Sequence, residues 1–275
     1  NDPSKKAKLN VNFDHFDIAK IMASEARFQN NIFSSINGAF EFQGKIFDAE
    51  QNFQELLNTW SGSGKLNQSN IQFQDIYFNI VNNEPFVLND GILKITNTQI
   101  LSPFINIKTN GTYNLTTSTI NIDSDLSTDL SKWDESLPMF DKSEGTGDGK
   151  INFTGNILAP NIFGNIKVKA KKLAYKNSLP EFSDLDGFIV FKNRKIEIQK
   201  FSAKKGPGTL DLTGTIDLPD ASTNKKSPVY NLKLSSQNAY FKFKLPIINY
   251  AEIFLDSDLS LSGREIPYSI VGQVN

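Results

Sequence analysis

A short phrase recurs along this chain: a small residue, then alternating apolar and polar residues, then a glycine. It occurs at 38–44, 149–155, 208–214 and 257–263. Alternation with period two gives a strand one apolar and one polar face, and the closing glycine tolerates a bulge or a tight bend. The recurrence therefore constrains the chain to a β architecture whose strands share one apolar side.

A longer phrase occurs twice with the same internal spacing. Phe86, Asp90, Gly91, Asn97 and Ile100 recur as Phe182, Asp186, Gly187, Asn193 and Ile196. Self-similarity at this length predicts stacked supersecondary units that share a continuous apolar surface, because a single unit cannot bury its own hydrophobic face. We expect the copies at 86–115 and 182–212 to adopt the same strand-turn-strand fold.

Composition removes several function classes. The chain has 275 residues, 39% of them hydrophobic, which is enough for a large all-β unit or two domains. The net charge of −1, with Lys and Arg spread throughout, gives no electrostatic footprint for nucleic acid. Without cysteine, neither disulfides nor thiolate metal sites form. No apolar run is long enough to span a membrane, so we expect any membrane anchor to lie outside this segment.

Helical patterns are short and few. Residues 48–60 carry a capping box at Asp48 and Gln51, an apolar stripe that includes Phe53 and Trp60, and a terminating Gly62. Weaker patterns at 17–27 and 128–137 predict two more short helices. A helix of this kind covers one end of a sheet in the simplest interpretation; binding to a partner is the alternative.

Nearly all remaining residues alternate as strands. The clearest example is 209–218, where Leu210, Leu212, Ile216 and Leu218 take one phase and Thr209, Asp211 and Thr213 the other. We predict that the apolar phase of such strands forms a lipid-facing set, which consists of Phe40, Phe42, Ile120, Ile122, Ile151, Phe153, Ile166, Val168, Leu210, Leu212, Ile216, Leu218, Leu232, Leu234, Leu259 and Leu261.

Turn-forming residues divide the chain. We predict turns at 82–85, 89–91, 184–187 and 204–208, and loops at 141–149 and 220–228. The organisation that follows is an N-terminal half at 1–137, a loop at 138–148 and a C-terminal β-repeat half at 149–275 that continues the first.

The fold class is all-β. The few predicted helices cannot cover so much apolar strand surface. We therefore expect an elongated, curled antiparallel sheet, a U-shaped groove or a solenoid-like form, with one or two short capping helices. A β-sandwich, in which two sheets cover each other, is the alternative.

Candidate chemical groups are sparse. His15 is the only histidine, so no histidine cluster can hold a metal. Residues 145–150 resemble a phosphate loop, but with three residues between the outer glycines and Ile151 after the lysine they are better explained as a turn before a strand. The pairs Asp123 with Asp125 and Asp256 with Asp258 lie on wet strand faces, and the spacing of Asp141, Glu144 and Asp148 fits no calcium loop. We predict no enzyme activity, cofactor or metal.

Several phrases resemble the AsmA-like and TamB-like envelope proteins. The segment 53–66, a helix followed by a glycine-rich turn and a strand, is similar to their C-terminal region, as are the strand phrases at 90–96 and 111–115. The phrases at 155–164 and 263–272 each place a proline between glycines and are similar to the repeats of that group.

The resemblance implies a function and a location. It implies a periplasmic protein, tethered to the inner membrane by a segment absent from this chain, whose apolar β-groove carries phospholipid toward the outer membrane. Phospholipid or another acyl-chain lipid would be the ligand, and envelope membrane proteins are further possible partners. A structural or protein-interaction β-scaffold in envelope assembly is the alternative.

Overall fold

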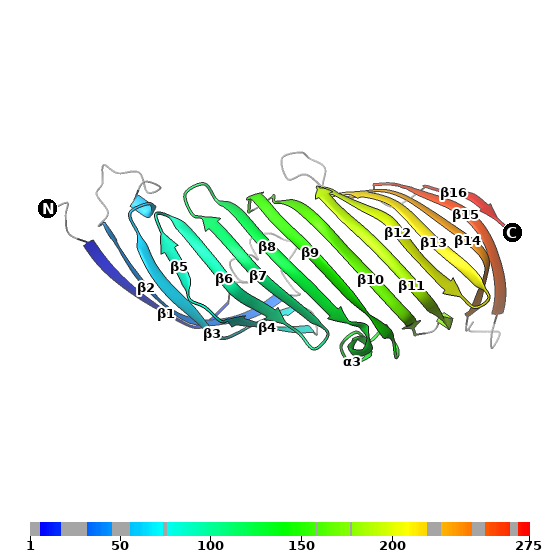
Figure 1. Ribbon diagram of the computed structural model, residues 1–275, viewed down its shortest axis with the longest axis horizontal. Coiled ribbons are helices and arrows are strands. Elements are labelled where there is room, and N and C mark those ends of the chain that lie inside the picture. The colour runs from blue at the N-terminus through cyan, green and yellow to red at the C-terminus, as the bar shows by residue number, and fades with distance from the viewer. Residues whose placement is uncertain are drawn as a thin grey trace. The chain divides into compact units, whose positions relative to one another are not determined.

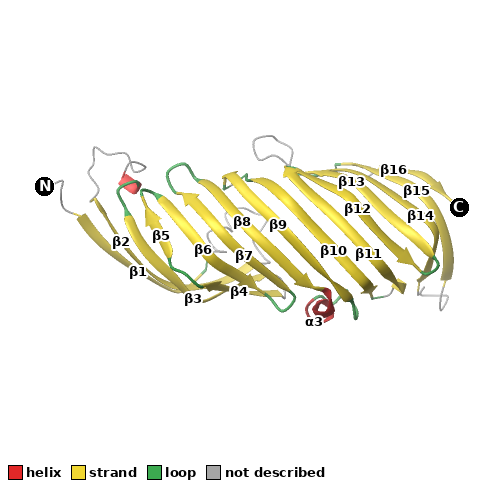
Figure 2. Cartoon of the chain, viewed as in Figure 1, coloured by secondary structure: helices red, strands yellow, loops and turns green. Residues whose placement is uncertain are grey.

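The computed structural model (Figure 1) describes residues 6–17, 32–45, 56–73, 76–157, 159–176, 178–218, 227–243, 251–264 and 269–275. Nearly all of these residues lie in strands (Figure 2). The first strands are β1 (Lys6–Phe16), β2 (Ile32–Lys45), β3 (Ser61–Phe73), β4 (Ile76–Asn82), β5 (Phe86–Asn89), β6 (Ile92–Leu101), β7 (Ile105–Asn114) and β8 (Thr119–Asp129). The later ones are β9 (Glu144–Asn156), β10 (Asn161–Tyr175), β11 (Ser178–Asn193), β12 (Lys195–Lys205), β13 (Gly208–Asp217), β14 (Val229–Phe243), β15 (Ala251–Gly263) and β16 (Ser269–Val274).

The strands form one antiparallel sheet in which hydrogen-bonded neighbours follow chain order. The short strand β5 stands off this path, because it pairs with both β3 and β6, and a further pairing of Leu179 with Lys242 joins β11 to β14. Consecutive antiparallel strands need only hairpin connections, so the order follows from local turns. The all-β prediction, with a long antiparallel sheet and a short helix, is confirmed, and the described strands do not divide into the two sheets of a sandwich.

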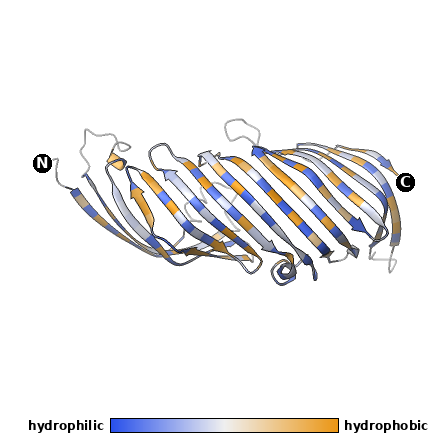
Figure 3. Cartoon of the chain, viewed as in Figure 1, coloured by the Kyte–Doolittle hydropathy of each residue, from blue (hydrophilic) through white to orange (hydrophobic). Residues whose placement is uncertain are grey.

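The strands group into two compact units. Unit 1 comprises residues 1–125 and 152–160, and unit 2 comprises 126–151 and 161–275. Along the strands of each unit, hydrophilic and hydrophobic residues alternate (Figure 3). The period-two alternation predicted from the sequence is thus the pattern of the sheet itself.

Aromatic rings form the apolar centre of unit 1. Phe40 of β2 lies 5.6 Å from Phe13 of β1 and 5.8 Å from Phe42, measured between ring centroids. It also stacks on Phe86 of β5 at 6.2 Å, with an interplanar angle of 3°. Ring contacts therefore run across β1, β2 and β5 on one side of the unit.

A short helical segment covers part of the apolar side of unit 2. The 3₁₀ turn η1 (Leu130–Lys132) leads into α3 (Trp133–Ser136), which confirms the helix predicted at 128–137. Leu130, only 1% exposed, packs with Ala170, Leu185 and Ala203, which are its buried neighbours on β10, β11 and β12. The indole Nε1 of Trp133 donates to Thr128 Oγ1 at 2.9 Å and fixes the segment against β8.

The polar side of unit 2 carries cross-strand ion pairs. Lys200 Nζ lies 2.7 Å from Asp186 Oδ2, and Lys192 Nζ lies 2.7 Å from Glu197 Oε2. Both pairs join β11 to β12, and similar pairs join β9 to β10 and β14 to β15. Such exposed pairs add little stability, so they indicate which side faces water more than they hold the sheet together.

The remaining helix predictions are tested only in part. Residues 18–27 lie outside the described residues, and so do 48–55 of the segment 48–60. Leu56 and Leu57 are helical, and the N–H of Thr59 and the N–H of Trp60 donate to their carbonyls. Gly62, predicted to end this helix, instead lies inside β3 opposite Phe42.

The loop predicted at 141–149 is wrong from Glu144 onward, because β9 begins there and includes the phosphate-loop-like residues. Gly145, Gly147 and Gly149 alternate on one side of β9, and a Cβ at any of them would crowd Ala170, Thr128 or Ile166. Glycines at every second position of a strand leave room for the side chains of neighbouring strands, so this pattern does not mark a turn. Residues 219–226 of the other predicted loop lie outside the described residues.

Three of the predicted turns are confirmed, at 82–85, 89–91 and 204–208. The turn predicted at 184–187 is wrong, because these residues lie within β11. The register between β11 and β12 shifts there, and Asp184 has a φ of 51°. Asp184 accordingly forms a β-bulge, which uses the same tolerance of positive φ as a turn.

The two long repeat copies are both β, but their turns fall at different positions. Asp90 and Gly91 form a hairpin turn between β5 and β6, whereas Asp186 and Gly187 lie inside β11. Asn97 sits at a bulge in β6, whereas its counterpart Asn193 lies at the β11–β12 hairpin. The prediction of one shared strand-turn-strand fold is wrong, because Asp-Gly and Asn residues fit both bulges and hairpin turns.

Candidate functional site

Strand register places the predicted lipid-facing residues of unit 2 on one side. Leu212 of β13 lies opposite Leu234 of β14, which lies opposite Leu259 of β15. In the same way Leu232 lies opposite Leu261. Directly opposite residues of antiparallel strands point to the same side of the sheet. We call this side of unit 2 the apolar face of unit 2; its predicted members are Ile151, Ile166, Val168, Leu210, Leu212, Ile216, Leu218, Leu232, Leu234, Leu259 and Leu261.

The same side of the sheet continues through the central strands of unit 2. Ile216 lies opposite Ile196 of β12, which lies opposite Phe191 of β11. Ile189 of β11 lies opposite Ile166 of β10. The sequence prediction omitted the members from β11 and β12, because residues 188–191 are apolar throughout and a bulge changes the phase between Ile198 and Phe201. These members are Ile189, Phe191, Ile196, Ile198 and Phe201.

Unit 1 has an equivalent side. Phe40 and Phe42 of β2 lie opposite Val11 and Leu9 of β1. On β8, the backbone of Ile122 lies against Gly111 of β7, and Ile120 lies on the same side of the strand as Ile122. We call this side of unit 1 the apolar face of unit 1; its predicted members are Phe40, Phe42, Ile120 and Ile122. On β9, Phe153 lies on the same side of the strand as Ile151.

Glycines recur on both faces between large side chains of the two flanking strands. Gly214 lies between Ile198 and Leu232, and Gly187 lies between Val168 and Phe201. A Cβ at Gly214 would run into the backbone of Asn231 and Leu232. The missing side chain lets neighbouring strands and their apolar groups come close together.

The predicted residues are half-buried, and none is fully buried. This holds for every member of the lipid-facing set, while Thr209, Asp211 and Thr213 on the opposite phase of β13 are exposed. The expected phase is thus confirmed for β13. The predicted apolar side chains keep part of their surface exposed, unlike Leu130, Ala170, Leu185 and Ala203, which are buried on the same side of unit 2.

One cation lies buried on the apolar face of unit 2. Lys205 of β12 is fully buried, and its Nζ donates to the carbonyl oxygen of Pro180. The ammonium group lies 4.1 Å from the ring centroid of Phe182 and 5.5 Å from that of Phe241. Burial lowers the pKa of Lys205 to about 8, against an opposing effect of Glu181. Sequence reasoning missed this residue, because a lysine at a strand end looks like any solvated charge.

The titratable residues considered as catalytic or metal-binding candidates do not lie together in one site. His15 is exposed on β1, and its Nδ1 lies 2.6 Å from Asp14 Oδ1. The four paired aspartates are exposed; Asp123 accepts from Asn152 and Asp258 pairs with Lys233. Asp141, Glu144 and Asp148 form no metal-binding group, and within the described part of the chain no three His, Asp or Glu residues do. No described helix is long and apolar enough to cross a membrane.

Comparisons with protein-family models, with curated proteins and with solved structures found no match for this chain. The geometry of the two apolar faces is therefore the basis for assigning a function.

Proposed function

We propose that this chain is a non-enzymatic, lipid-binding segment that holds acyl chains on its apolar faces and conducts phospholipid between the inner and outer membranes of a bacterial envelope. One observation carries the proposal: apolar side chains from many successive strands share one side of each unit and stay half-buried. A folded protein gains stability by covering such a surface, and a lipid tail can cover it without specific chemistry.

The energetics of an acyl chain suit this surface. Each methylene that leaves water gains about 0.8 kcal/mol, so a chain of ordinary length gains many kcal/mol from contact with rows of Leu and Ile. Because apolar contacts are nondirectional, a tail can move from the side chains of one strand to those of the next without losing a specific partner. The phosphate headgroup stays in water, and no residue needs to act as a catalyst.

The location and family belong to the same proposal. The resemblance of 53–66, 90–96 and 111–115 to AsmA-like and TamB-like proteins supports a periplasmic protein tethered to the inner membrane by a further segment. Envelope membrane proteins would then be its partners.

A β-scaffold in envelope assembly is the second candidate, and the edge strand β16 favours it. Every residue of β16 is exposed, and Ile270 and Val271 are 66% and 67% exposed. An edge strand without charge or proline can pair with a strand of another chain.

Lipid extraction tests the proposal. The purified chain is extracted with organic solvent and its lipids are identified by mass spectrometry, alongside Leu212→Asp and the matched Thr213→Asp. Leu212 lies on the apolar face and Thr213 on the exposed phase of the same strand. We expect phospholipid to co-purify with the wild type and with Thr213→Asp, and to be reduced with Leu212→Asp. A wild-type chain without lipid would favour the scaffold.

The thermal stability of the two variants separates an open face from a closed one. A charge placed in a sealed core costs several kcal/mol and prevents folding, whereas a charge on an open face remains hydrated. We expect Leu212→Asp to fold with a melting temperature near that of Thr213→Asp. Failure of Leu212→Asp alone to fold would contradict an open face.

A further inference from the structure

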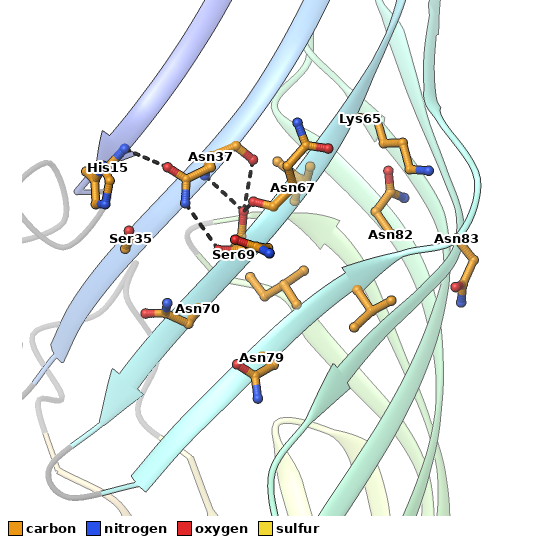
Figure 4. A pocket seen from close by; sticks show the side chains of 14 residues that line it. His15, Ser35, Asn37, Lys65, Asn67, Ser69, Asn70, Asn79, Asn82 and Asn83 are labelled. Atoms are coloured by element: carbon orange, nitrogen blue, oxygen red, sulfur yellow. Dashed lines mark hydrogen bonds between the residues drawn. The ribbon is translucent and has the colours of Figure 1, made fainter.

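A polar cavity of about 970 Å³ lies in unit 1, at a break in the pairing of β3. Residues 69–73 of β3 pair with β4 and residues 62–64 pair with β5. On this side of β3, Lys65, Leu66, Asn67 and Gln68 have no partner among the described strands. These four residues and the end of β4 line the cavity (Figure 4). Lys65, Asn67, Asn70 and Asn79 line the cavity from the polar side of the sheet. Leu66, Ile80 and Asn82 share the strand phase of Phe40, so the lining comes from both sides of the sheet.

The wall of the cavity is built around Asn37. Two bulge residues with positive φ, His15 at 50° and Gln68 at 36°, flank it on β1 and β3. The His15 N–H donates to Asn37 Oδ1 at 2.8 Å, and Asn37 Nδ2 donates to the Gln68 carbonyl at 3.1 Å. Ser69, 1% exposed, exchanges hydrogen bonds with the backbone of Asn37. The cavity therefore has a fixed, hydrogen-bonded frame.

The described lining residues are rich in amides and include no carboxylate. Asn70 and Asn79 lie directly opposite each other on β3 and β4, and neither they nor Asn67 have a side-chain hydrogen bond to a described residue. Asn82 is 4% exposed; its Nδ2 donates to Thr98, but its Oδ1 is buried without a hydrogen-bond partner among the described residues. The lining thus offers carboxamide donors and acceptors that no described residue uses, and one of them is buried at a cost that a ligand would remove.

We infer that this cavity binds a neutral carbohydrate. A carboxamide group both donates and accepts hydrogen bonds, and a sugar hydroxyl does the same. A group of such amides therefore matches a polyhydroxylated ligand. An anionic ligand fits less well, because Lys65 is the one lysine or arginine among the described lining residues, and His15 contacts Asp14. The inference is independent of lipid binding, because it rests on amide groups and not on the rows of apolar side chains.

A glycan array of neutral oligosaccharides, followed by calorimetric titration of the best binder, tests this inference. Asn79→Leu and Asn70→Leu each remove an unused amide from the lining, and we expect each to weaken binding about tenfold, because a sugar hydroxyl loses its partner. Asn79→Asp keeps the size and the acceptor but loses the donor, and should also weaken binding. Asn231→Leu, on an exposed position of β14 in unit 2, is the matched control and should bind like the wild type.

Three results would overturn the inference. The first is that no neutral glycan binds the wild type. The second is that a bound glycan is unaffected by all three cavity variants, which would place it elsewhere. The third is that inorganic phosphate, titrated in the same way, binds more tightly than any neutral glycan and loses its affinity in Lys65→Gln, which would make the cavity an anion site.

Discussion

Phe40 and Phe86 stack on each other across Gly64. Gly64 of β3 pairs with Phe40 on one side and with Phe86 on the other, and the two rings meet above it with their planes 3° apart. A Cβ at residue 64 would overlap the ring of Phe40. The glycine thus makes the space in which rings from two non-adjacent strands form a continuous aromatic surface.

Substitution of Gly64 should therefore destabilise the fold through Phe40. Gly64→Val forces the ring off the strand, and we expect the free energy of unfolding to fall by about 1–3 kcal/mol in urea titrations. Ser63→Val is the control, since Ser63 is exposed on the other side of β3. The double variant Gly64→Val with Phe40→Ala should lose less than the sum of the two single losses. Strict additivity would contradict the contact.

Bulges are secured by side chains from neighbouring strands. Asn97, with a φ of 47°, donates its N–H to Asn110 Oδ1 at 2.8 Å, just as His15 does to Asn37. We expect Asn110→Ala to lower the free energy of unfolding by about 1 kcal/mol, because the exposed N–H then bonds only to water. Asn110→Asp keeps the acceptor and should stay close to the wild type. Equal losses in both variants would show that this hydrogen bond does not matter.

Lys205 predicts a rise of stability with pH. Its pKa is about 8 when folded and 10.5 otherwise, so between these values the unfolded chain holds the proton more often. Where the unfolded state binds more protons, the free energy of unfolding increases with pH. The cost of the buried charge is therefore complete below about pH 8 and is relieved as the pH rises toward 10.5.

The measurement compares the wild type with Lys205→Met, which keeps an apolar stem without the charge. From pH 7 to 10.5, the stability of the wild type should increase relative to that of Lys205→Met, because all other titrating groups are shared. A difference that does not change with pH would show that Lys205 stays protonated and hydrated in the folded chain.

The residues that the sequence assigned correctly are those where one local rule suffices. Alternation placed Leu210 and Leu212 on the half-buried phase and Thr209 on the exposed one, because period two is a property of every strand. The hairpin at Asp90 and Gly91 followed from their tolerance of positive φ. The assembly of Leu212, Leu234 and Leu259 into one row needed only correct phases and hairpin connections.

The residues that the sequence did not assign depend on neighbours distant in the chain. Asn37 lies between the bulges at His15 and Gln68 and forms hydrogen bonds with both. The sequence around each of these three residues does not predict that they come together. Lys205 is buried only because Phe182 and Phe241 come from other strands. The sequence predicts a turn at Gly145 and Gly147, because the side chains that need their space belong to β8 and β10 and are distant in the chain.

Hydrogen exchange checks the revised assignment of 144–149. If these residues belong to β9, their ladder amides should exchange slowly, like those of the same strand at 150–155. Exchange as fast as that of an exposed loop, at 144–149 alone, would contradict this assignment and favour the loop that the sequence predicts.

Site-specific photo-crosslinking along β13 tests the central claim most directly. A photoreactive amino acid is placed in turn at positions 210, 211, 212 and 213, and crosslinked phospholipid is detected in bacterial cells after illumination. If acyl chains lie on the apolar face, crosslinks should form from 210 and 212 and be absent from 211 and 213, because these phases point to opposite sides of the sheet. Equal labelling at all four positions, or labelling at none, would contradict lipid binding on this face.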